Sequence, residues 1–166
     1  MSDFLTFRVG SFEMQSSKMI VSDPSYKKSR AGTAKPAIAN LSKVVSRVKT
    51  GKWWGFVLKT KEKNSRVWSL IAMSDGVESK DLKKWISIGD VAVDSGMMGI
   101  FDMKHYPEEE NQDQFYKTIS KWVDHKHSSM IYDNWGVVST TGYGDGSYPA
   151  NKCLIDGKVV AVQVDF

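Results

Sequence analysis

The sequence has little of what secreted and membrane-spanning proteins depend on. Its 166 residues include one cysteine, Cys153, so no disulfide can form within the chain, which is typical of a reducing compartment. No apolar run approaches the roughly 20 residues of a membrane helix, and the N-terminus lacks the basic and apolar regions of a signal peptide. We therefore expect a cytoplasmic protein, in the host cytoplasm if it is viral, with no membrane partner.

Fingerprints of common catalytic and nucleotide-binding loops are also missing. No nucleophile-elbow pattern surrounds Ser95, and the glycine-rich run at 142–146 matches neither a P-loop nor the dinucleotide fingerprint. His125 and His127 lie two positions apart, so they would not share a helical face as metal ligands. The sequence favours a protein without catalysis and predicts no catalytic residue, no metal and no cofactor.

Positive charge is plentiful but unevenly distributed. Residues 27–66 hold twelve lysines or arginines and one acid, which gives +11, whereas residues 67–166 carry −6. This asymmetry indicates an anionic partner for the N-terminal half. The alternative is a solvated, lysine-rich surface. Nucleic acid is a less favoured partner, because the isoelectric point of about 9.0 is only moderately basic.

Alternating apolar residues predict a mainly β protein. Two helices are expected, over residues 37–49 and over residues 115–123, where Phe115, Ile119, Trp122 and Val123 would share a face. Asp156-Gly157 predicts a two-residue hairpin turn. The strands are expected over residues 4–9, 18–22, 53–60, 66–73, 85–93, 97–103, 135–140, 148–155 and 158–166. Short strands without a βαβ rhythm predict one α+β domain over residues 1–166, an antiparallel β-sandwich or barrel with two packed helices.

Three aspartates at expected strand ends are the leading candidates for a site. Asp23 precedes a proline, Asp94 precedes Ser95, and Asp145 lies between two glycines. If their loops converge, the carboxylates would line a pocket and serve as cation ligands or as acid and base. The alternative is that each aspartate only accepts hydrogen bonds within its own turn.

Aromatic residues add further candidate contacts. Trp53 and Trp54 are adjacent, so in a strand one faces the core and the other faces outward beside Lys52. An exposed ring beside cations suits a base or a nucleotide, whereas the alternative is core packing covered by lysine stems. The candidate ligand-binding residues are Asp23, Tyr26, Trp54, Asp94, Ser95, Tyr143, Asp145 and Tyr148.

Four motifs, taken together, resemble the DUF4241-type proteins of bacteria and phages. They are VSDPSY at 21–26, VAVDSGMMGIFD at 91–102, VSTTGYGDGSYP at 138–149 and the terminal hairpin at 156–166. Ser25 and Met97 stand where the family pattern has cysteine and glutamine, so a cysteine nucleophile at position 25 is absent. The resemblance implies that the three loop motifs belong together, and it implies no known activity.

The favoured function is binding of a small anionic, nucleotide-derived ligand without catalysis, for example sequestration of a host immune signal by a phage protein. One alternative is a metal-assisted hydrolase that uses the loop aspartates. A second is a protein-interaction inhibitor or immunity protein, and a homo-oligomer is compatible with each of these readings.

Overall fold

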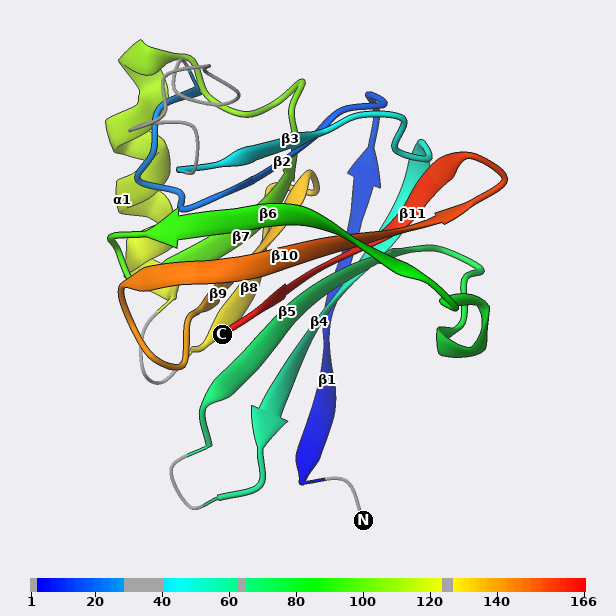
Figure 1. Cartoon of the computed structure of the whole chain (residues 1–166). Helices are drawn as coiled ribbons and strands as arrows, with labels where there is room; N and C mark the ends of the chain where they lie inside the picture. The colour runs from blue at the N-terminus through cyan, green and yellow to red at the C-terminus, as the bar shows by residue number, and fades with distance from the viewer. Residues whose placement is uncertain (1–2, 29–40, 63–64, 124–126) are drawn as a thin grey trace.

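Two antiparallel sheets lie face to face in the computed structural model, which describes residues 3–28, 41–62, 65–123 and 127–166 (Figure 1). The first sheet has the order β1 (Phe4–Met14), β4 (Gly51–Thr60), β5 (Val67–Ser74), β11 (Lys158–Asp165), β10 (Gly146–Ile155), β6 (Trp85–Val93). The second has the order β3 (Lys43–Val45), β2 (Met19–Ser22), β7 (Met97–Asp102), β9 (Gly136–Thr140), β8 (Ser129–Tyr132). The expected antiparallel, mainly β architecture is confirmed, and it is a sandwich rather than a closed barrel.

The second sheet divides the apolar interior into two cores, because successive side chains of a strand point to opposite faces. On β7, Met98 and Ile100 pack in the core between the sheets, against residues such as Trp53. Met97 and Phe101 face the other way, toward the helix α1 (Gln112–Trp122). The second sheet is therefore the middle layer, with the first sheet on one face and α1 on the other.

The helix α1 confirms one of the two expected helices. Phe115 and Ile119 are buried against the second sheet, and Val123 follows them into the same core. The expectation that Trp122 shares the buried face is wrong. Trp122 is the last residue of the helix, and its side chain is 60% exposed. The described chain also has two short 3-10 turns, η2 (Ser79–Asp81) and η3 (Glu109–Asn111). None of these helices is long and apolar enough to cross a membrane.

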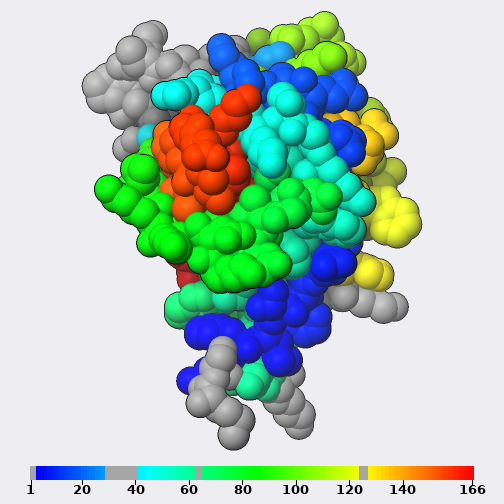
Figure 2. Space-filling view, turned by 90° about the vertical axis from the view of Figure 1, so that its right-hand side faces the viewer, coloured from blue at the N-terminus to red at the C-terminus, as the bar shows by residue number. Residues whose placement is uncertain are grey.

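The helix expected over residues 37–49 is wrong for its described part, residues 41–49. There the chain forms β3, which pairs with β2, and Val48 then makes a parallel bridge with Val159 on β11. Figure 2 shows this cyan segment beside the red β10–β11 hairpin. Val45 and Val48 still enter the core, with the spacing that suggested a helix. Pairing with two strands satisfies the backbone and overrides the helical pattern. Residues 37–40 lie outside the described chain.

The hairpin predicted at Asp156-Gly157 is confirmed. Asp156 and Gly157 have φ values of +51° and +75°, and Ile155 pairs directly with Lys158 across the turn. Positive φ at both central positions is the geometry of a type I′ turn, whose twist matches that of antiparallel strands. The turn holds β10 and β11 side by side in the middle of the first sheet.

Candidate functional site

Asp23 organises the site from the end of β2. Its carboxylate is fully buried and accepts hydrogen bonds at 2.8 Å from the backbone N–H groups of both Asp94 and Ser95. The Ser95 hydroxyl donates to the same carboxylate at 2.6 Å, and the backbone N–H of Ser25 donates at 2.7 Å. Two of the three predicted aspartate loops therefore meet at this point. Each carboxylate oxygen of Asp23 already has two donors, so Asp23 acts first as a structural acceptor.

Tyr26 joins the same cluster from the turn after β2. Its hydroxyl donates to Oδ2 of Asp94 at 2.8 Å. Burial raises the pKa of the Tyr26 hydroxyl well above its usual range, and the Asp94 carboxylate raises it further. The charges of Asp23 and Asp145 act in the same direction. The Tyr26 hydroxyl is therefore a hydrogen-bond donor at neutral pH, and Asp94 is the aspartate whose side chain it contacts.

A raised Tyr26 pKa predicts that stability falls at high pH. Above the ordinary pKa of 10.0 the unfolded chain releases this proton while the native protein retains it, so the free energy of unfolding declines as pH rises. Urea unfolding between about pH 8 and pH 11.5 should show a shallower decline in Tyr26→Phe than in the parent protein. Identical pH dependence in the two proteins would contradict the assignment.

The loop between β9 and β10 is held against this cluster. The backbone N–H of Thr141 donates to the Gly96 carbonyl at 2.8 Å, which joins the loop to the turn before β7. The hydroxyl of Tyr148 donates to the Gly144 carbonyl at 2.8 Å, and the Thr141 hydroxyl donates to the same carbonyl. Gly144 has φ of +79°, a conformation that side chains rarely adopt. The Tyr148 side chain, which is only 9% exposed, thus holds the loop through its hydrogen bond to Gly144.

Gly142 brings this loop into contact with β5. A Cβ at position 142 would lie 2.2 Å from the carbonyl oxygen of Val67, which is backbone and cannot move aside. The absence of a side chain lets residues 141–144 lie directly over the beginning of β5. This contact places the exposed Tyr143 ring beside Arg66, whose guanidinium carbon is 5.5 Å from the ring centroid.

A cleft of about 450 Å³ opens beside this loop, between α1, the beginning of β7 and the end of β9. Among the described residues that line it, seven carry hydroxyl groups if Tyr116 is included, and Arg66 is the one that is charged. We name it the arginine cleft. Its lining is Ser65, Arg66, Val67, Ser95, Gly96, Met97, Tyr116, Ser120, Val123, Ser128, Thr140, Thr141, Gly142 and Gly144. Among the predicted site residues, only Ser95 lines this cleft.

Trp54 lies elsewhere in the molecule. As predicted, one tryptophan of the pair, Trp53, is fully buried, while Trp54 is partly exposed with Lys52 and Arg8 each 4.5 Å from its ring. The Trp54 indole donates to Oδ1 of Asp75, just past the end of β5, whereas the arginine cleft adjoins its beginning. The strand between them spans roughly 25 Å, so Trp54 does not belong to the same site.

The sequence interpretation missed a second buried aspartate with the same role. Asp102, at the end of β7, accepts hydrogen bonds from the backbone N–H groups of Gln15 (2.7 Å) and Ser16 (3.1 Å). It also accepts hydrogen bonds from the Ser16 hydroxyl and from the backbone N–H of Lys104, the latter at 3.0 Å. The paired strands β2 and β7 thus have reciprocal corners, in which each Asp holds the turn before the other strand. The shared signal is Asp at a strand end and Ser in the facing turn.

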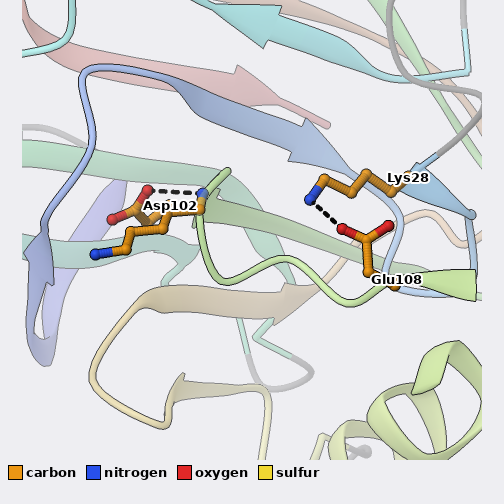
Figure 3. Close-up of polar contacts among 4 residues, drawn as sticks. Lys28, Asp102 and Glu108 are labelled. Atoms are coloured by element: carbon orange, nitrogen blue, oxygen red, sulfur yellow. Dashed lines mark hydrogen bonds and ion pairs between the residues drawn. The ribbon is translucent and has the colours of Figure 1, made fainter.

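Part of the basic segment is paired within the chain. Lys28 forms an ion pair with Glu108 at 2.8 Å, drawn in Figure 3, and Lys27 forms one with Glu109 at 2.5 Å. The charge asymmetry along the sequence is therefore partly compensated in space, where the segment after β2 meets the acidic residues before α1. These ion pairs reduce the positive charge that the basic segment can offer to a nucleic-acid partner.

The histidines and the cysteine contribute little to the site. In the described ranges no group of three or more His, Cys, Asp or Glu residues could hold a metal ion. His125 lies outside those ranges. Cys153 is buried on β10, where it packs in the interior.

No family model, curated protein or solved structure matches this chain. The resemblance to DUF4241-type proteins therefore stays a prediction, and the functional conclusion depends on the geometry of the site alone.

Proposed function

We propose that the protein binds a small anionic molecule in the arginine cleft and does not transform it. The observation that carries the proposal is the lining of this cleft, in which the described residues place a guanidinium among six serine and threonine hydroxyls. A guanidinium offers paired donors to carboxylate or phosphate oxygens, and hydroxyls complete such a shell with weaker bonds. The cleft volume of about 450 Å³ also falls within the range of small-molecule sites.

The neighbouring carboxylates favour binding over hydrolysis. A metal-assisted hydrolase needs carboxylate oxygens that can accept a cation or activate a water molecule. Both oxygens of Asp23 are occupied by donors from its own protein, and Asp94 accepts the Tyr26 hydroxyl. The Asp23 carboxylate holds Ser95 in place at one end of the cleft, and its role is therefore structural.

A nucleotide-derived ligand is the preferred class, because phosphate oxygens match an arginine surrounded by hydroxyls. Tight binding would lower the free concentration of such a molecule by mass action. If the protein is viral, a nucleotide signal of the host's immunity is the ligand we propose for it. Its action would then require abundance and affinity but no turnover.

Removing the charge of Arg66 should weaken binding strongly. We expect Arg66→Gln to raise the dissociation constant for nucleotides about 10- to 100-fold, since a hydrogen bond to a charged group contributes about 1.5–3 kcal/mol. Isothermal titration with mono-, di- and cyclic nucleotides measures the change. Arg8→Gln is the matched control, because Arg8 lies over Trp54 and away from the cleft. If no nucleotide binds the parent protein, or Arg66→Gln binds as tightly as the parent, the proposal fails.

A further inference from the structure

A second cleft, of about 630 Å³, lies on the other side of Tyr143. It sits where β1 begins, β4 ends and β5 begins, at the end of the first sheet that extends past the second sheet in Figure 1. Its lining is Asp3, Phe4, Thr60, Lys61, Glu62, Arg66, Trp68 and Tyr143. We name it the aromatic cleft. Arg66 and the loop that carries Tyr143 border both clefts, so the two are neighbouring parts of one surface.

Three aromatic rings form a row along this cleft. The centroids of Phe4 and Trp68 are 5.2 Å apart, and Trp68 meets Tyr143 edge to face at 6.0 Å. None of the three belongs to either apolar core, and the Tyr143 side chain is 53% exposed. Rings outside the core with accessible faces are stacking surfaces for planar heteroaromatic groups.

The backbone around these rings is held by hydrogen bonds. The backbone N–H of Lys61 donates to the Asp3 carbonyl at 3.2 Å, which joins the end of β4 to the start of β1. The backbone N–H of Thr60 donates to the Arg66 carbonyl at 3.1 Å, which joins the end of β4 to the residue before β5. Hydrogen bonds therefore fix the strand ends that carry the rings, and the cleft is already formed before a ligand binds.

The charged residues of the cleft suit a nucleotide in a particular orientation. Arg66 stands at the border with the arginine cleft, where a phosphate bound there would also lie. Asp3 and Glu62 line the aromatic cleft, and carboxylates accept hydrogen bonds from exocyclic amino groups. Adenine, guanine and cytosine carry such groups, and uracil does not.

From this arrangement we infer that the aromatic cleft is the base subsite of a nucleotide whose phosphate binds at Arg66. The inference rests on the proposed function and extends it. The base stacks on the Trp68–Tyr143 pair, the sugar passes Tyr143, and the phosphate contacts the guanidinium and the hydroxyls of the arginine cleft. Bases with an exocyclic amino group bind more tightly than uracil.

Titration calorimetry with AMP, UMP and ribose 5-phosphate tests the subsite. In the parent protein we expect AMP to bind at least about tenfold more tightly than ribose 5-phosphate, since stacking on one aromatic residue supplies that much. UMP should fall between them. Tyr143→Leu should weaken AMP binding much more than ribose 5-phosphate binding, and so bring the two dissociation constants close together. Tyr143 is exposed, so this variant should fold, and Trp68→Leu provides a second measurement.

A matched control and separate outcomes keep the two proposals distinct. Trp122→Leu removes an exposed aromatic from the end of α1, outside both cleft linings, and should change nothing. Equal affinity for AMP and ribose 5-phosphate, unaffected by Tyr143→Leu, overturns the base subsite but leaves anion binding at Arg66 intact. Absence of binding by all three probes overturns both proposals.

Discussion

The Asp23→Asn variant is expected to lose about 2–4 kcal/mol of unfolding free energy, because it disturbs four hydrogen bonds to one buried acceptor. The asparagine amide keeps one acceptor oxygen, but its NH₂ group faces backbone N–H and hydroxyl donors and cannot accept from them. Whichever carboxylate oxygen the amide nitrogen replaces, two of the four donors lose their partner. Urea unfolding at neutral pH measures the loss.

The reciprocal corner supplies the comparison for this prediction. Asp102→Asn should cost a similar amount, since Asp102 also accepts four hydrogen bonds and is fully buried. Asp145→Asn is the matched control, and its exposed side chain should change stability by less than about 0.5 kcal/mol. An Asp23→Asn protein of unchanged stability that no longer binds nucleotides would show that this carboxylate contacts the ligand and does not act as scaffold.

The Phe101→Ala variant is expected to lose about 3–5 kcal/mol, the range for removing a large aromatic side chain from a core. The Phe101 ring is fully buried and lies 5.4 Å from Phe115 on α1 and 5.6 Å from Trp135 between their centroids. It also covers Gly136 on β9, where an added Cβ would approach the ring to 2.2 Å. Alanine would leave a cavity between these neighbours, and chemical denaturation measures its cost.

The location of the cavity predicts which part of the molecule is affected most. Phe101 belongs to the core that joins α1 to the second sheet, so amide exchange in residues 112–122 should accelerate more than exchange in β4 or β11. Phe101→Leu should recover most of the lost stability, because it refills much of the cavity. Trp122→Ala, on the exposed side of the helix, should have little effect. Uniform acceleration throughout the protein would contradict a local role for Phe101.

The sequence predicted the strands well where side chains alternate or a turn marks the boundary. The β10–β11 hairpin is an example, since Asp156-Gly157 encodes its own turn geometry. β8 was missed because its four residues are all half-buried and show no alternation. The false helix at residues 41–49 arose because valines spaced three apart fit a helix as well as a strand followed by a turn. Pairing with distant strands decided between these outcomes, and single-sequence patterns carry no record of such pairing.

The candidate site was predicted only in part, for a similar reason. Asp23, Asp94 and Ser95 stood out in the sequence because turn residues at strand ends are conspicuous, and the structure brings them together. Arg66 was one of twelve basic residues in its segment, and nothing local distinguished it. Its position depends on Gly142 bringing the β9–β10 loop over β5, a contact across more than seventy residues.

The reciprocal aspartate corners have a consequence for the kinetics of recognition. Because Asp23 holds the turn at 94–95 from within the protein, that wall of the arginine cleft exists before any ligand arrives. Little conformational entropy is then spent on ordering this wall during association. Binding should proceed in one bimolecular phase whose observed rate rises linearly with ligand concentration, and affinity differences among nucleotides should lie mainly in their dissociation rates.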